Sequence, residues 1–440
     1  MTRFATLSVL LASLFLAPAL PAQQIALVHA TLIDGTGAAA VEDATVLIGP
    51  DGRIRAIGAD VNLPDSAKQV DLKGKFIVPG IINLHGHVGN VKGLSQAREH
   101  FTRQNVIDTL RTFAEYGVTT TTSMGTDEDE MIGVRDERRR DAFQSARVFT
   151  ALQGFTTLGG YPTQAPGVKG VAQEVASASQ AKVWVDKLAD KDADLVKMWV
   201  DGHHGEFEKL PPAVYKAIIK QAHKRGLPTL AHIYELSDAK ALVKAGIDIL
   251  GHSVRDQPID AELIALMKKN GTHYAATITR EQSTYIYHSP PEWLDDPFFR
   301  KAVSDDIVEG VRTQLKQAQS AQAVIDQGRK DFEMAMKNAK ALVDAGVNVA
   351  FGTDTGPPGR FAGFFEHWEA ELMVEAGISP MRIIQAWSKD SSEALEIEKD
   401  FGTLERGKVA DLVVLDADPL ADITNTRKIH AVYLGGKKFE

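Results

Sequence analysis

The sequence predicts an α/β protein whose main part is a (β/α)8 barrel. Short apolar runs alternate with longer helical patterns through the middle of the chain, and eight such runs can be counted. This alternation favours a parallel sheet covered by helices. Ligand-type side chains also stand where several of the runs end. In such barrels the active site lies at the C-terminal ends of the strands, so the three observations agree.

Length and composition limit the class of protein. The 440 residues are 44% hydrophobic, which suffices for one large core or for a large domain with a smaller companion. The formal net charge is -9 and the basic residues are dispersed, so nucleic acid is not an expected partner. The chain has no cysteine, which excludes a disulfide framework and a lipid anchor on cysteine.

Residues 1–22 have the pattern of a secretory signal peptide. Arg3 precedes a run rich in leucine and alanine, and cleavage after Ala19 or Ala22 fits equally well. The apolar part is short for a membrane span, and no later stretch of about 18 apolar residues follows. We therefore expect a periplasmic or secreted protein that does not contact the membrane after cleavage. An uncleaved N-terminal anchor is the alternative.

Both ends of the remaining chain have a sequence pattern that is typical of short β-strands. Short β-type runs broken by turns lie at 25–28, 45–48 and 54–57, and again at 410–415 and 430–434. We expect residues 23–76 and 403–440 to pair into one small composite β-sandwich domain. The barrel then occupies residues 77–402.

The predicted barrel strands lie at 77–84, 117–124, 146–153, 194–200, 228–233, 248–253, 272–279 and 348–353. Helical periodicity follows in segments such as 211–225 and 238–246, each closed by a glycine. The connection at 280–347 is unusually long, and its first part is aromatic. Long connections are often lids, so this insertion is a candidate lid. Solvated helices explain its charged second part equally well.

The apolar run that begins at Phe76 ends in His85-Gly86-His87. Side chains alternate along a strand, so His85 and His87 point to the same side. One such pair is weak evidence. Further ligand types stand at later strands: Lys197 lies in the fourth, His232 and His252 end the fifth and sixth, and Asp354 ends the eighth. Imidazole with carboxylate suits zinc first, and manganese, cobalt or iron are harder to exclude.

Lys197 needs a separate explanation, because an ammonium in an apolar strand beside a cation is costly. A neutral amine can take up carbon dioxide and become a carbamate, an anionic ligand with two oxygens. Such a carbamate could bridge two divalent ions. His85, His87 and Asp354 would then hold one ion, and His232 and His252 the other. The alternatives are a lysine that reaches solvent or one that pairs with Asp201.

The motifs together resemble the amidohydrolase superfamily. The residues that carry the resemblance are 78–87, Val196-Lys197, 231–234, Gly251-His252, 352–355 and 402–415. The resemblance implies a metal-bearing TIM barrel with a small β domain, and Lys197 is similar to the carboxylated lysine of the binuclear branch that contains prolidase-like and ochratoxinase-like enzymes. Prolidase-like members carry a Gly-Gly loop where this chain has residues 199–205, so substrate identity does not transfer.

The predicted reaction is hydrolysis of an amide C–N bond in a small molecule, such as an N-acyl amino acid or a dipeptide. Two metal ions would generate a bridging hydroxide and polarise the carbonyl. Asp354 would act as the proton shuttle from this nucleophile to the leaving amine. A lactonase or phosphotriesterase with the same binuclear site is the alternative. A non-catalytic barrel is a third, although such a protein should have lost ligands.

Several further residues are candidates near the site. Alternation from His232 would direct Tyr234 to the pocket, where its hydroxyl could donate to an oxyanion; a packed tyrosine is the alternative. The candidate substrate contacts are His203, His204, Arg255 and Tyr285. For the two histidines an exposed loop position, and for Arg255 a structural ion pair with a neighbour, are the alternatives. Oligomeric state stays open, a homo-oligomer included.

Overall fold

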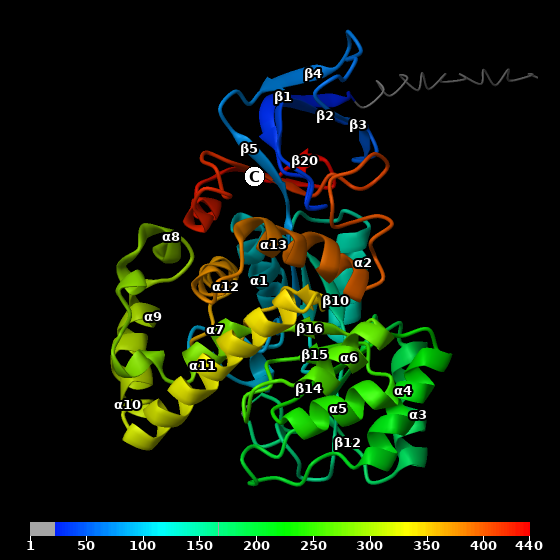
Figure 1. Cartoon of the computed structure of the whole chain (residues 1–440), viewed down its shortest axis with the longest axis vertical. Coiled ribbons are helices and arrows are strands. Elements are labelled where there is room, and N and C mark those ends of the chain that lie inside the picture. The colour runs from blue at the N-terminus through cyan, green and yellow to red at the C-terminus, as the bar shows by residue number, and fades with distance from the viewer. Residues whose placement is uncertain (1–22, 166) are drawn as a thin grey trace, which may run out of the picture.

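A computed structural model describes residues 23–165 and 167–440 (Figure 1). The predicted signal peptide, residues 1–22, lies outside the described residues. Among the described residues, no helix has the length and apolar character needed to cross a membrane. The architecture combines one mainly antiparallel sheet, built from both chain ends, with a set of short parallel strands and their helices.

The sheet from the chain ends has eight strands. The first part contributes β1 Ile25–Leu32, β2 Val41–Ile48, β3 Ile54–Gly58, β4 Lys68–Asp71 and β5 Phe76–Pro79, and the last part contributes β18 Leu412–Leu415, β19 Ile429–Leu434 and β20 Lys437–Lys438. The strand order is β20-β19-β18-β5-β1-β2-β3, with β4 beside β1. The pairing of the two distant segments is therefore confirmed, and β5 and β18 are the strands that join them. A separate β-sandwich domain with the boundaries given above stays a prediction.

The first predicted barrel strand, 77–84, is wrong as one strand. Its residues belong to β5 of the small sheet and to β6 Ile81–Gly86 of the parallel set. The chain changes sheets at Gly80, whose backbone N–H donates to Asp411 O at 3.0 Å, while Ile81 N–H donates to Gly117 O. A Cβ at Gly80 would lie 2.1 Å from the Thr119 side chain. Only glycine therefore fits at this crossing.

The parallel strands form two groups. One has the order β10-β9-β6 and the other β12-β11-β13-β14-β15-β16-β17. Their bounds are β9 Val118–Ser123, β10 Arg147–Thr150, β11 Phe155–Thr156, β12 Gln173–Glu174, β13 Val196–Trp199, β14 Thr229–His232, β15 Ile249–Gly251, β16 His273–Ala275 and β17 Val349–Ala350. The seven later predicted runs each contain one of these strands, which is shorter than the apolar run around it.

Backbone hydrogen bonds also link the margins of the two groups. Leu84 N–H donates to Phe351 O at 2.8 Å, and Asp194 N–H donates to Thr150 O at 2.9 Å. The parallel strands with their intervening helices fit a TIM barrel. Full closure of the barrel stays a prediction.

The helices follow the strands along the chain. They are α1 Arg103–Glu115, α2 Glu130–Arg139, α3 Ala178–Asp190, α4 Pro212–Lys224, α5 Leu236–Ala245, α6 Ala261–Asn270, α7 Ile278–Ser283, α8 Pro297–Arg300, α9 Asp305–Gly310, α10 Lys316–Ala318, α11 Gln322–Asp344, α12 Phe364–Glu375, α13 Pro380–Gln385 and α14 Ser391–Ala394. The predicted helices near 211–225 and 238–246 are confirmed as α4 and α5. Gly246 ends α5 in the left-handed conformation at φ 91°, which is easy only for glycine.

The long connection between β16 and β17 contains α7 to α11, and α8, α9 and α10 lie together along one side of the molecule in Figure 1. Its aromatic part is packed inward. The ring of Trp293 lies 4.9 Å from those of Phe299 and Phe364, measured between centroids. The charged second part is dominated by α11, a single helix of 23 residues. A lid function for 280–347 stays a prediction.

Candidate metal centre

The two histidines of the first strand lie together with the aspartate of the last. His85 is fully buried at the end of β6, and His87 follows it on the same side. Oδ1 of Asp354 lies 3.0 Å from Nε2 of His87 and 3.6 Å from Nε2 of His85. One ligand atom from each of the three residues falls within 4.8 Å of the others. This spacing suits one metal ion.

The other two histidines continue this cluster. His232 is the last residue of β14, and His252 directly follows β15. The ring centroid of His252 lies 4.3 Å from that of His232 and 4.4 Å from that of His85. Four buried or nearly buried imidazoles thus form one continuous group.

Lys197 lies within this group rather than at its edge. Its side chain is fully buried, and its Nζ lies 3.1 Å from Nε2 of His85. Burial lowers the pKa of this amine to about 7, so a large neutral fraction is present near neutrality. Its full burial contradicts the alternative of a lysine that reaches bulk solvent. Pairing with Asp201 is also absent from the contacts of the described residues, because that carboxylate bonds to His232 instead.

Three histidines have one ring nitrogen held by a neighbour. Nδ1 of His87 lies 2.9 Å from Oγ1 of Thr126, and Nδ1 of His252 lies 2.9 Å from Oγ1 of Thr277. Nε2 of His232 lies 2.8 Å from Oδ2 of Asp201. Such contacts fix the ring and leave the other nitrogen for a metal.

The fourth histidine supplies a direct test of fit. Nδ1 of His85 is buried without a hydrogen-bond partner in the described part of the chain. The other nitrogen of this ring, Nε2, faces the cluster, at 3.1 Å from Nζ of Lys197 and 3.6 Å from Oδ1 of Asp354. A group of imidazoles with one carboxylate is a typical donor set for a divalent ion. The residues therefore fit a metal.

Asp354 has two different faces. Its Oδ1 faces the histidines, while its Oδ2 accepts a hydrogen bond from Arg360 and lies 3.9 Å from Nε of Arg280. Burial opposes ionisation of this carboxyl, but Arg360 and the contact with His87 outweigh it and hold its pKa well below the usual range. Its backbone adopts φ 57°, and its N–H donates to His85 O at 2.7 Å.

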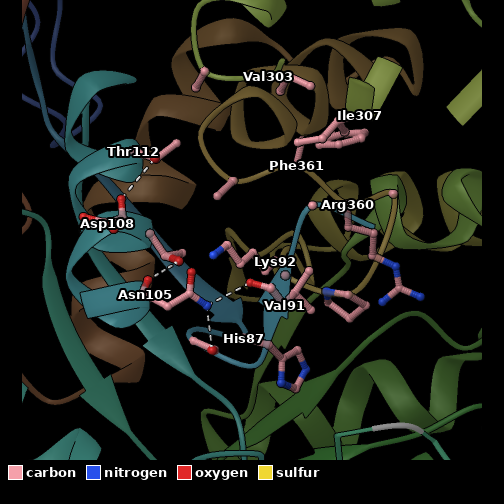
Figure 2. Close-up of a pocket in the computed structure, with 18 residues that line it drawn as sticks. His87, Val91, Lys92, Asn105, Asp108, Thr112, Val303, Ile307, Arg360 and Phe361 are labelled. Carbon is pink, nitrogen blue, oxygen red and sulfur yellow. Dashed lines mark hydrogen bonds between the residues drawn. The ribbon is translucent and has the colours of Figure 1, made fainter. Parts of the chain in front are cut away.

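Two connected pockets reach the centre. The inner cavity, of about 130 Å³, is lined by His87, Lys197, His232, His252 and Asp354 together with Tyr161 and Trp199. The outer pocket, of about 270 Å³, is drawn in Figure 2 and leads away from His87. Both are lined by His87, Pro357 and Arg360, so these residues form the boundary between them.

The placement of Tyr234 does not follow the alternation argument. Strand β14 ends at His232, so the period of two does not extend to this residue. The Tyr234 hydroxyl donates to Oδ1 of Asp331 at 2.9 Å, and its side chain lines a different pocket, beside α11. This arrangement matches the alternative of a packed tyrosine.

Two of the four candidate substrate contacts are also placed elsewhere. Arg255 is buried and pairs with Glu281, and its Nη2 donates to Ile233 O at 2.9 Å, as in the structural alternative. Tyr285 packs against α11, with its ring centroid 6.0 Å from that of Phe332.

The two loop histidines lie nearer the centre. The ring of His203 stacks on Tyr161, which lines the inner cavity, at 5.2 Å between centroids and an interplanar angle of 15°. The exposed His204 instead meets the ring of Tyr234 edge-on, at 4.7 Å between centroids. Only His203 is therefore in contact with a residue that lines the cavity.

Sequence reasoning missed the residues that surround the ligands: Thr126, Thr277, Tyr161, Arg280 and Arg360. Asp201 was considered only as a partner for Lys197. One signal was available, because Arg360 closes a loop rich in glycine and proline directly after the predicted ligand Asp354. The two threonines carry no motif of their own.

Comparisons with known proteins agree with this geometry. Residues 76–438 match the family described as "Amidohydrolase family". The chain is 28% identical to ochratoxinase from Aspergillus niger over 239 residues, which are 53% of this chain and 42% of the relative. The chain therefore spans less than half the length of this curated relative.

Solved structures match over a longer span. A putative prolidase from Bifidobacterium longum has a TM-score of 0.77 at 22% identity and covers 95% of both chains. A Xaa-Pro dipeptidase with bound methionine has a TM-score of 0.76 at 22% identity and covers 95% of this chain and 100% of its own. At this identity the likeness shows the fold.

Proposed function

This chain belongs to the amidohydrolase family, and we propose that it hydrolyses an amide C–N bond in a small molecule, an N-acyl amino acid or a dipeptide. One observation carries the proposal: three histidines, Lys197 and Asp354 line a single cavity near the C-terminal ends of parallel strands, and the fourth histidine, His85, lies beside them with its Nε2 3.1 Å from Nζ of Lys197. The names of the relatives, an ochratoxinase and a Xaa-Pro dipeptidase, support the same reaction class.

Part of the proposal is that two divalent ions, most simply Zn²⁺, are held in the cavity. His85, His87 and Asp354 would hold one, His232 and His252 the other, and a carbamate on Lys197 would bind both. Bound ions would supply Lewis-acid polarisation of the scissile carbonyl and activation of water. The low pKa and full burial of Lys197 favour carbamate formation, because only the neutral amine reacts with carbon dioxide.

The chain's own groups supply the proton transfer. Asp354 stands between the histidines and the boundary of the outer pocket, so its carboxylate can accept the proton of the attacking water and donate it to the leaving nitrogen. This transfer is needed because an amide leaves poorly as an anion. His203, through its stack on Tyr161, is the candidate substrate contact that this arrangement retains.

The test is a panel of N-acyl amino acids, dipeptides, lactones and phosphotriesters offered to protein loaded with Zn²⁺ and bicarbonate. We expect turnover of the amides. Exclusive turnover of lactones or phosphotriesters would favour the alternative hydrolase. Metal content well below one ion per chain with no turnover would refute the enzyme assignment.

Asp354→Asn supplies the matched variant for this panel. The amide keeps the size of the side chain but accepts a proton poorly, so turnover should fall by at least about 10²-fold while the fold is kept. Asp295→Asn, at an exposed carboxylate paired with Arg312, is the control and should leave turnover unchanged. Export through residues 1–22 and a homo-oligomeric state stay part of the proposal, tested by fractionation of the source cells and by light scattering.

A further inference from the structure

Arg360 stands where the inner cavity meets the outer pocket. Figure 2 shows His87 at one end of the outer pocket and Val303, Ile307 and Phe361 at the opposite end, with Arg360 along one side. Arg360 also lines the inner cavity beside Asp354. Any ligand that extends from the metal ligands into the outer pocket therefore passes its guanidinium.

The fold holds this arginine firmly. The loop after Asp354 closes on itself, because Gly356 N–H donates to Arg360 O at 3.0 Å and Arg360 N–H donates to Pro357 O at 2.9 Å. The Tyr287 hydroxyl donates to Gly359 O and so ties the loop to the insertion. Nε of Arg360 donates to Oγ of Ser283 at 3.1 Å. A preorganised guanidinium binds an anion at low entropic cost.

Some N–H donors of the Arg360 guanidinium have no acceptor among the described residues. Its Nη1 is directed to Asp354 and its Nε to Ser283, and among the described residues none accepts a hydrogen bond from Nη2. The side chain is 16% exposed, at the cavity boundary. Arginine stays charged at any working pH and presents its donors in a fork that matches a carboxylate.

The contact between Arg360 and Asp354 decides which carboxylate this would be. Asp354 is the proposed proton donor to the leaving nitrogen, so that nitrogen must lie next to it. In an N-acyl amino acid or a dipeptide, a single α-carbon separates this nitrogen from the free carboxylate. A group that binds this carboxylate must therefore be an immediate neighbour of Asp354, and Arg360 is one.

The outer pocket accounts for the remaining substituent on the same α-carbon. The side chain of the leaving amino acid starts beside Arg360. Polar groups of Lys92, Asn105 and Asp108 also line the pocket, but its far end carries the apolar groups of Val303, Ile307 and Phe361. Apolar surface of this kind favours a branched aliphatic or aromatic side chain over a charged one.

We propose that Arg360 binds the α-carboxylate of the leaving amino acid and that the outer pocket takes its apolar side chain. The substrates are thus amides whose amine half is an apolar α-amino acid with a free carboxylate. The inference rests on the proposed function for its chemistry, but its binding claim can be tested without turnover.

The kinetic test compares an N-acyl-L-leucine, carrying the acyl group best cleaved in the panel above, with its leucinol analogue, which lacks the carboxylate. Wild type should prefer the carboxylate in kcat/KM by about 10- to 100-fold, the range of one charged hydrogen bond. Arg360→Gln should lose this preference, mostly through KM, and Arg360→Lys should keep part of it. Arg312→Gln, at an exposed arginine on the insertion, is the control.

The binding test uses L-leucine and L-leucinol, measured by titration calorimetry on protein loaded with Zn²⁺. L-Leucine should bind more tightly to wild type by about 10-fold or more, and equally with L-leucinol to Arg360→Gln. Equal affinity of the two for wild type, or no binding of either, overturns the inference. If the preference is present but no amide is hydrolysed, the inference stands and the proposed function fails.

A second variant tests the outer pocket independently, in case Arg360→Gln does not fold. Ile307 is only partly buried, so Ile307→Ala should fold and should enlarge the outer pocket. The variant should lower kcat/KM for the N-acyl-L-leucine by about 10-fold relative to kcat/KM for the N-acylglycine with the same acyl group, because the contact with the branched side chain is lost. An unchanged ratio of leucine to glycine would overturn the assignment of the pocket.

Discussion

Oδ2 of Asp201 lies 2.8 Å from Nε2 of His232, and both side chains are almost fully buried. Burial alone would favour the neutral acid, but His232 and Arg255 hold the pKa of Asp201 far below its usual range. The carboxylate therefore remains charged and fixes the imidazole, as partners of metal-bound histidines commonly do.

Asp201→Asn should for this reason weaken metal binding without removing any proposed ligand. We expect the affinity for added Zn²⁺ to fall by about 10- to 100-fold, measured by competition with a chromogenic chelator. Asp295→Asn serves as the exposed control. Unchanged affinity in Asp201→Asn would show that this contact does not support a metal ligand.

Lys197→Ala should lower metal content. The lysine is fully buried beside His85, so its loss removes the amine that would carry the carbamate. Elemental analysis should show a clear drop in metal per chain, and the carbamate signal from ¹³C-labelled bicarbonate should disappear from the NMR spectrum. Metal content equal to that of wild type would refute the carbamate.

Asp127 should make stability depend on pH. It is buried between the hydroxyls of Ser123 and Thr150, and burial raises its pKa to about 7. Its pKa in the unfolded chain is about 3.9, so between these values the native state binds more protons than the unfolded state. Its contribution to stability is therefore present at low pH and is lost as the pH rises to about 7.

Asp127→Asn removes this titration, because the amide stays neutral and can bond to both hydroxyls. The difference in the free energy of unfolding between the variant and wild type should therefore rise by about 2–4 kcal/mol, in favour of the variant, from pH 4 to pH 8. Urea unfolding of the metal-free protein measures it. A difference independent of pH would contradict the raised pKa.

Trp293→Ala should destabilise the insertion. The indole is nearly buried between Phe299 and Phe364, so its removal leaves a cavity that costs about 3–5 kcal/mol. Urea unfolding should show the loss. Val324→Ala, at an exposed position on α11, should change stability by less than about 0.5 kcal/mol. Comparable effects for the two variants would show that the aromatic cluster is not the anchor of this segment.

The sequence was most informative where a pattern repeats. Apolar runs that alternate with helical patterns located eight of the ten strands in the two parallel groups and missed β11 and β12. A period of two placed His85 and His87 on one side. The same argument failed at Tyr234, because β14 ends two residues earlier. The count of apolar runs also merged β5 with β6, because the apolar run continues through Gly80, where the chain changes sheets.

The residues that contact the proposed ligands could not be predicted from such repeating patterns. Thr126, Thr277 and Asp201 meet their histidines across different strand ends, at contacts set by three-dimensional packing and not by spacing in the chain. Arg360 is a similar case, since its neighbours Ser283 and Tyr287 come from the insertion. Contacts between distant loops leave no periodic signal.

The pairing of β5 with β18 also has a consequence for the order in which parts of this chain can fold. Phe76–Pro79 leads through Gly80 directly into the strand that carries His85, yet its antiparallel partner is Leu412–Leu415. During synthesis, the support next to the first ligand strand is therefore made only after nearly the whole chain. Contacts of such long sequence separation form slowly. The ligand cluster should thus assemble after translation, when both ends of the chain are available to the same sheet.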